Sequence, residues 1–162
     1  LSIVDTNPIV VDGTNDEKDP VSAPYAAASG IDYLVTWSHT MSKDVFAKHL
    51  DLRPQIISSS ASGASVIGKG IATSTIWTGS QYATAFTTPA GAVMGATLGT
   101  VDAPAPVRPF LVSSSGDGAQ LVFAAGRLTA AYQRLAKEPA YGGVFRVFVR
   151  DAGPVRGHAA SR

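Results

Sequence analysis

Four acidic residues near the start of the chain have the chemistry of metal ligands. Asp12, Asp16, Glu17 and Asp19 lie within eight residues, and their carboxylate oxygens are the hard ligands that calcium prefers. Their spacing fits no EF-hand loop, and the stretch DGTNDEKDP has the composition of a polar turn. The favoured interpretation is a solvated acidic turn, with Asp12, Asp16 and Asp19 kept as calcium candidates. Asp117, in the sequence SGDG, is interpreted as a turn residue for the same reason.

A second candidate is the stretch GASVIGK at positions 63–69, which matches the G-x-x-x-x-G-K pattern of phosphate-binding loops. Such a loop needs a strand before it, a helix after it, and a Ser or Thr beside the lysine to bind magnesium. Position 70 is glycine, and residues 71–78 have the composition of a strand. We therefore interpret residues 63–69 as a flexible loop between strands and expect no nucleotide site.

The remaining catalytic residue types form no recognisable motif. His39, His49 and His158 are not at zinc-binding spacing, and no G-x-S-x-G sequence occurs. A Ser/His/Asp triad depends on proximity in space, so the sequence leaves it open. Four arginines flank predicted strands, which favours scattered solvated side chains over a basic patch: Arg127, Arg134, Arg146 and Arg150. We assign no catalytic or cofactor-binding residue and expect no cofactor other than the calcium candidate.

The amino-acid composition excludes several classes of protein. With 45% apolar and 15% charged residues, the 162-residue chain is too hydrophobic to be disordered. The net charge of +1 gives no electrostatic footprint for nucleic acid or an anionic membrane. No apolar run reaches the roughly 18–20 residues of a membrane span. The sequence starts with Leu1 and shows no signal peptide, which suggests a processed piece or one whose ends were left out.

The elements that must position these residues come from an internal repeat. Residues 30–37 (GIDYLVTW), 79–86 (GSQYATAF) and 126–132 (GRLTAAY) each contain a glycine, a short strand-like run and an aromatic residue. Proline-led β-branched or apolar runs accompany each copy at 8–11, 54–57 and 109–112. Further strand candidates are 44–50, where a helix is also possible, 92–98 and 146–150. Residues 127–137 also fit helical spacing, but the repeat register predicts a strand followed by a loop.

A repeat of about 48 residues with four short strands is typical of a propeller blade. We therefore predict an all-β, propeller-like fold with three four-stranded antiparallel blades at about 1–50, 51–98 and 99–152, followed by a tail at 153–162. The alternative is a β-sandwich. Trp37, Phe86 and Tyr132 are then expected to pack between blades, because stacking blades buries both faces of each sheet.

The order of these elements resembles bacterial secreted β-propeller-like repeat proteins, whose blades read roughly PAVA…G…YLVVW…DIYAQRV…G. The matching residues are PVSA at 20–23, YLVTW at 33–37 and DVFA at 44–47. The last copy, with YGG at 141–143 and RVFVR at 146–150, also resembles terminal blades of such proteins. The second copy departs from the pattern at Ala83 and Ala85. The resemblance implies a β-propeller and a secreted or cell-surface location.

Two functions follow as hypotheses, because the fold itself hosts many activities. The first is a non-enzymatic, extracytoplasmic binding or scaffold module within a larger propeller or multichain assembly. The alternative is a non-catalytic fragment or subunit of a larger secreted enzyme. Three repeats are fewer than the 4–8 blades of typical propellers. We therefore expect another polypeptide chain, or a second copy of this one, to complete the assembly, with a protein or a glycan as ligand.

Overall fold

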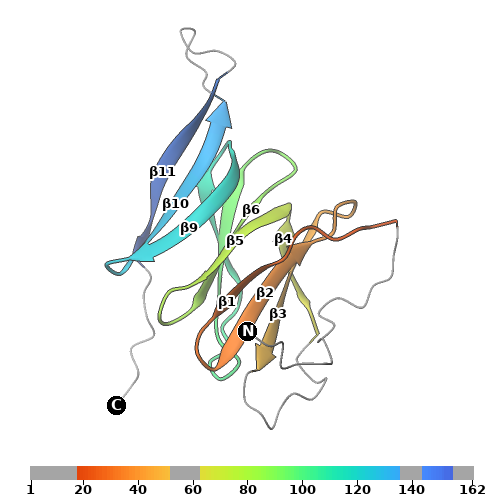
Figure 1. Cartoon of the computed structure of the whole chain (residues 1–162), viewed down its shortest axis with the longest axis vertical. Helices are drawn as coiled ribbons and strands as arrows, with labels where there is room; N and C mark the ends of the chain where they lie inside the picture. The colour runs from red at the N-terminus through yellow and green to blue at the C-terminus, as the bar shows by residue number, and fades with distance from the viewer. Residues whose placement is uncertain (1–17, 52–62, 136–143, 155–162) are drawn as a thin grey trace, which may run out of the picture.

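The computed structural model describes residues 18–51, 63–135 and 144–154, which form eleven strands and no helix (Figure 1). The strands make three antiparallel sheets, in which strands consecutive in the chain are neighbours. Sheet 1 contains β1 (Tyr25–Ala28), β2 (Asp32–Ser38), β3 (Asp44–Asp51) and β4 (Ser65–Lys69). Sheet 2 contains β5 (Ile71–Trp77), β6 (Tyr82–Thr87), β7 (Val93–Leu98) and β8 (Arg108–Ser113). Sheet 3 contains β9 (Asp117–Ala124), β10 (Arg127–Leu135) and β11 (Phe145–Pro154).

The repeated glycines occupy equivalent turns between the first and second strands of the three sheets. Gly30, Gly79 and Gly126 have φ angles of 98°, 89° and 74°, which side chains on L-residues rarely adopt. In the third turn Ala125 also has a positive φ of 50°, so Ala125 and Gly126 form the two-residue turn between paired Ala124 and Arg127. This tighter turn explains why the third copy is shorter than the others.

Sheet 2 lies between the other two sheets and is covered on both faces (Figure 1). Side chains of β6 alternate between these faces. Tyr82 and Phe86 belong to a core cluster with Leu34 and Val45 of sheet 1. Ala83 and Ala85 belong to a second cluster, which contains Leu121, Leu128 and Tyr132 of sheet 3. The small side chains of the second copy are therefore fully buried against bulky residues of the next sheet.

The sheets contact each other mainly through their first two strands. Strand β5 contacts both β1 and β9, and β6 contacts β9. Polar side chains add specific bonds at these contacts: the Ser38 Oγ accepts a hydrogen bond from the Ala72 N–H at 2.7 Å. Likewise, the Ser74 Oγ accepts one from the Leu121 N–H at 3.1 Å. The first strands of the three sheets are thus held side by side.

The structure confirms the all-β prediction and decides the ambiguous elements. Residues 44–51 form β3, and residues 127–135 form β10, so the helical interpretations are wrong in the described part of the chain. Leu128, Ala130 and Tyr132 alternate toward sheet 2, and it is this period of two that decides the structure of β10. The strand expected at 54–57 lies outside the described residues.

Three other expectations need correction. The flexible loop expected at 63–69 is mostly strand β4, which pairs with β3 at the edge of sheet 1. Sheet 3 has three strands in the described residues, where four were expected. Phe86 and Tyr132 pack between sheets as expected, whereas Trp37 shares the alternate side of β2 with exposed Tyr33. Trp37 is buried there by stacking on Phe46, with ring centroids 5.6 Å apart.

Candidate functional site

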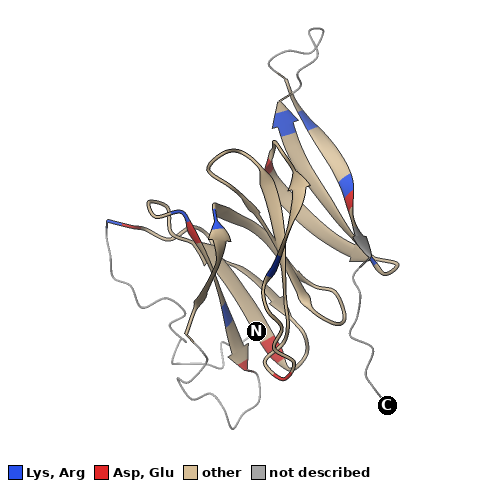
Figure 2. Cartoon of the chain, turned by 180° about the vertical axis from the view of Figure 1, so that it is seen from behind, with Lys and Arg blue, Asp and Glu red and all other residues tan. Residues whose placement is uncertain are grey.

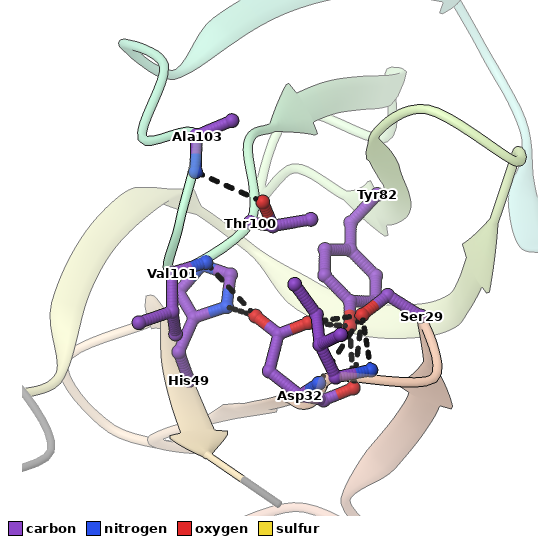
Figure 3. A network of polar contacts seen from close by, with 8 residues as sticks. Ser29, Asp32, His49, Tyr82, Thr100, Val101 and Ala103 are labelled. Carbon is purple, nitrogen blue, oxygen red and sulfur yellow. Dashed lines mark hydrogen bonds and ion pairs between the residues drawn. The ribbon is translucent and has the colours of Figure 1, made fainter. Parts of the chain in front are cut away.

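The carboxylate of Asp32 is the centre of a buried polar network that joins sheets 1 and 2 (Figure 3). Its Oδ1 accepts hydrogen bonds from the hydroxyls of Ser29 and Tyr82, the latter at 2.7 Å. Its Oδ2 lies 2.9 Å from the His49 Nδ1 and accepts a bond from the Val101 N–H at 3.0 Å. Asp32 itself is fully buried, so these four groups supply the polar contacts that water gives an exposed carboxylate.

Each member of the network is positioned by a different element. Ser29 precedes Gly30 in the β1–β2 turn, and its Oγ also lies 3.2 Å from the Asp32 N–H. His49 faces Asp32 because it pairs with Leu34, two residues along the same face of β2. Tyr82 enters from β6 of sheet 2, and Val101 from the segment between β7 and β8. The network therefore links two sheets and a connecting segment.

Burial and hydrogen bonding act in opposite directions on the pKa of Asp32. Burial raises the pKa, since it removes water from the charged form, but the bonds from Ser29, Tyr82, Val101 and His49 outweigh it. The net pKa lies below the ordinary value of 3.8, so the carboxylate is charged at neutral pH. Burial, together with the neighbouring Asp32 charge, raises the pKa of Tyr82 well above its ordinary value. The Tyr82 hydroxyl is therefore a fixed proton donor.

This arrangement does not have the order of a catalytic triad. In a triad the imidazole lies between the nucleophilic hydroxyl and the carboxylate. Here the carboxylate lies between Ser29 and His49, and the Ser29 hydroxyl donates to Asp32. A proton cannot pass from this serine to the histidine along these bonds. The chemistry that the network supports is a charged structural clamp between sheets.

The other residues proposed as sites serve turns and strand ends where the structure describes them. The Oδ1 of Asp19 accepts a bond from the Met41 N–H at 2.7 Å, and its Oδ2 lies 3.3 Å from the Nδ1 of His39. Burial of Asp19 raises its pKa, but the bonds from Met41, Ser42 and His39 have the larger effect, so that the net pKa is lowered. Asp12, Asp16, Glu17 and His158 lie outside the described residues. Within the described residues no three His, Asp or Glu side chains are placed to hold a metal ion.

The basic residues singled out in the sequence are also engaged in local contacts. Lys69 ends β4 and forms an ion pair with Asp44 at 2.7 Å, and β5 follows it in place of the helix that a phosphate-binding loop needs. Arg127 pairs with Asp151, and Arg134 lies over the ring of Phe148, 4.1 Å from its centroid. Figure 2 shows charged residues dispersed over the described sheets, and Arg134 and Arg146 are cross-strand partners on β10 and β11.

A second feature is an apolar surface on the side of sheet 3 that faces away from sheet 2. Cross-strand partners share one face of a sheet, and Ala131 pairs with Val149, Gln133 with Val147 and Leu135 with Phe145. Thr129, on the same face, pairs with Val122 of β9. We call this surface the sheet 3 outer face, and its exposed large apolar side chains are Val122, Leu135, Phe145, Val147 and Val149. Val147 and Val149 are 75% and 71% exposed, so their burial contributes little to the stability of the described chain.

The comparisons with known proteins add no family to these observations. No family model matches the sequence, and no curated protein matches it. Among the described residues, no helix is long and apolar enough to cross a membrane.

Proposed function

We propose that this chain is a non-enzymatic binding or scaffold module that works outside the cytoplasm as part of a larger β-propeller or multichain assembly. The observation that carries the proposal is the sheet 3 outer face. Exposed apolar side chains gathered on one face of a sheet in this way are typical of protein interaction sites. The extracytoplasmic setting is supported by the sequence resemblance alone.

Three features of the fold support a propeller-like assembly. The sheets follow one another as simple antiparallel meanders, and in each of them, within the described residues, the turn between the first two strands contains the repeated glycine. They converge at their first strands, as blades do around an axis. Sheet 2 has a neighbouring sheet on each side, and as a result β6 is buried on both of its faces. A propeller of 4–8 blades would bury the sheet 3 outer face in the same way.

The chemistry of the described polar residues also favours binding over catalysis. The buried carboxylate of Asp32 is occupied by four donors, and the Ser29 hydroxyl is turned toward it. A reacting group needs a free donor or acceptor directed at substrate. The arrangement supplies rigidity between sheets, which a scaffold requires.

The proposal is tested by changing the sheet 3 outer face without disturbing the core. We expect Val147→Asp with Val149→Asp to release the chain as a folded monomer from whatever particle it forms in its native source. Leu111→Asp is the matched control, because Leu111 is also an exposed strand residue, 53% exposed, on β8 of sheet 2. Native mass spectrometry of the particles gives the readout. A wild-type chain that is monomeric in its source, with no difference among the variants, would refute the proposal.

A further inference from the structure

We propose that the sheet 3 outer face docks on the outer face of sheet 1 of a second copy of this chain, head to tail, so that two copies close a ring of six sheets. The inference rests on the proposed function and names the partner of that same face. It follows from the register of the three repeats, which assigns each sheet one face toward the preceding sheet and one toward the following sheet.

The face toward the preceding sheet is defined by the second strand of each sheet. In β6, Tyr82 and Phe86 pack on sheet 1. In β10, Leu128 and Tyr132 pack on sheet 2. The equivalent residues of β2, counted from the repeated glycine, are Tyr33 and Trp37. They lie on the side of sheet 1 away from sheet 2, a side we call the sheet 1 outer face, where no preceding sheet exists in the described chain.

The sheet 1 outer face has the character of an acceptor for another sheet. Tyr33 is 41% exposed, and Val66, which pairs with Phe46 on the same face, is 54% exposed. Val35 lies between Tyr33 and Trp37 on this face and is half-buried. An aromatic and two valines on one flat side of a sheet are the residue types that pack between the described sheets.

The face toward the following sheet shows the opposite alternation. In β2, Leu34 belongs to the core between sheets 1 and 2, and the Thr36 hydroxyl lies 2.5 Å from that of Thr75 in sheet 2. In β6, Ala83 and Ala85 pack on sheet 3. The equivalent position in β10 is Ala131, on the sheet 3 outer face. The corresponding faces of sheets 1 and 2 are each buried against the next sheet. The sheet 3 outer face is the third face of this kind.

The sheet 1 outer face of a second copy offers a surface on which the sheet 3 outer face can pack. Within the described residues, each copy leaves uncovered the sheet 3 outer face, which corresponds to a face toward a following sheet, and the sheet 1 outer face, which corresponds to a face toward a preceding sheet, so the contact joins different patches. Such heterologous contacts form a closed ring when the rotation between copies closes. Two copies give six sheets, within the 4–8 blades of known propellers. The ring contains two identical interfaces, each continuing the packing seen between sheets 1 and 2 and between sheets 2 and 3.

The head-to-tail geometry makes a complementation test possible. Val147→Asp places a carboxylate on the sheet 3 outer face, and Tyr33→Asp places one on the sheet 1 outer face. Sedimentation velocity of the full chain measures the dimer dissociation constant. Hot-spot residues near the centre of an interface are worth about 2 kcal/mol or more, so we expect each substitution to weaken each interface about 30-fold, and the ring carries two interfaces. Leu111→Asp is expected to leave the dimer intact.

Mixing the two variants then gives the decisive result. A pair of one Val147→Asp copy and one Tyr33→Asp copy has one unchanged interface, while both substitutions fall in the other. We therefore expect the heterodimer to bind at least as tightly as one unchanged interface allows, and more tightly than a homodimer whose two weakened interfaces together fall short of that. Circular dichroism of each variant confirms that exposed positions were changed without loss of the fold.

Four outcomes would overturn the inference. A dimer broken by Val147→Asp but indifferent to Tyr33→Asp would mean that two sheet 3 faces meet each other. A wild-type chain that grows into longer oligomers would mean that the contact does not close at two copies. A particle that holds a different polypeptide on the sheet 3 outer face would overturn the second copy as partner and leave the proposed function standing. A purified chain that stays monomeric would overturn the second copy as partner, and a chain that is also monomeric in its native source would overturn the proposed function as well.

Discussion

The Asp32 network gives the sharpest prediction about stability. The substitution Asp32→Asn keeps the size of the side chain but removes its charge and one acceptor. If the amide oxygen takes the Oδ2 position, it retains the Val101 N–H and the His49 ring as partners. The amide nitrogen then replaces the oxygen that accepts from Ser29 and Tyr82. Both hydroxyls must reorient around a side chain that is fully buried.

The magnitude follows from the bonds that change. Hydrogen bonds to a charged group contribute roughly 1.5–3 kcal/mol each. In Asp32→Asn the bonds from Ser29 and Tyr82 lose their acceptor, while the Val101 N–H and the His49 ring keep an acceptor that is no longer charged. The hydroxyls recover part of this by accepting from the new amide. We expect Asp32→Asn to lower the free energy of unfolding by about 2–3 kcal/mol. We expect Asp32→Ala to cost about 3–5 kcal/mol, since it leaves buried donors without a partner.

The pH dependence of stability gives a second test of the Asp32 network, and its direction follows from the lowered pKa. The pKa of Asp32 is lowered in the folded chain, so its contribution to stability is present above the ordinary value of 3.8 and is lost as the pH falls through the lowered pKa. The difference in stability between wild type and Asp32→Asn should therefore be constant from neutral pH to about pH 4.5 and shrink below about pH 3.8. A difference that grows on acidification would contradict the assignment of a charged Asp32.

Urea unfolding followed by tryptophan fluorescence measures these values, since Trp37 is buried and Trp77 packs against Tyr82. The measurement is best made in a Val147→Asp background, so that dissociation of copies does not add to unfolding. Asp44→Asn is the matched control, because Asp44 pairs with the exposed Lys69 and such surface pairs contribute about 0–1 kcal/mol. If Asp32→Asn costs no more than this control, the network is not a clamp.

Three further predictions concern packing and turns, each measured by the same unfolding assay. Trp37→Ala should cost about 3–5 kcal/mol, because a large buried aromatic is deleted, and a change under about 0.5 kcal/mol would contradict its burial. Gly79→Ala should cost about 1–2 kcal/mol from its φ of 89°, whereas Gly63→Ala, where the added Cβ also meets open space, should be near neutral. Gly68→Ala should cost about 1–3 kcal/mol, because its Cβ would lie 2.5 Å from the ring of Phe86, and an unchanged stability would mean that the ring moves freely.

The sequence is informative about the elements whose signals are local. The three glycines predict the turns because their φ requirement belongs to one residue. The repeat register predicts β10 although its alanine and leucine residues favour helix, and the strand forms because burial between sheets outweighs intrinsic propensity. Strand β4 was missed because SASGAS at 60–65 has loop composition, while the strand gains its stability from pairing with β3.

The Asp32 network was missed because its members are distant in sequence. His49, Tyr82 and Val101 lie 17, 50 and 69 residues from Asp32. The available signal was an aspartate at the first position of a largely apolar strand, DYLVTWS. The sheet 3 outer face was partly visible in the alternation of residues 145–149, but its exposure depends on how the sheets stack, which no local pattern encodes.

The most direct test of the account is the accessibility of position 147 as a function of concentration. The chain contains no cysteine, so Val147→Cys introduces a single thiol that an alkylating reagent can report. We predict that the labelling rate at this position falls as copies associate at higher concentration, while the thiol of Leu111→Cys labels at a constant rate. Equal and concentration-independent labelling at both positions would contradict the claim that the sheet 3 outer face is a docking surface.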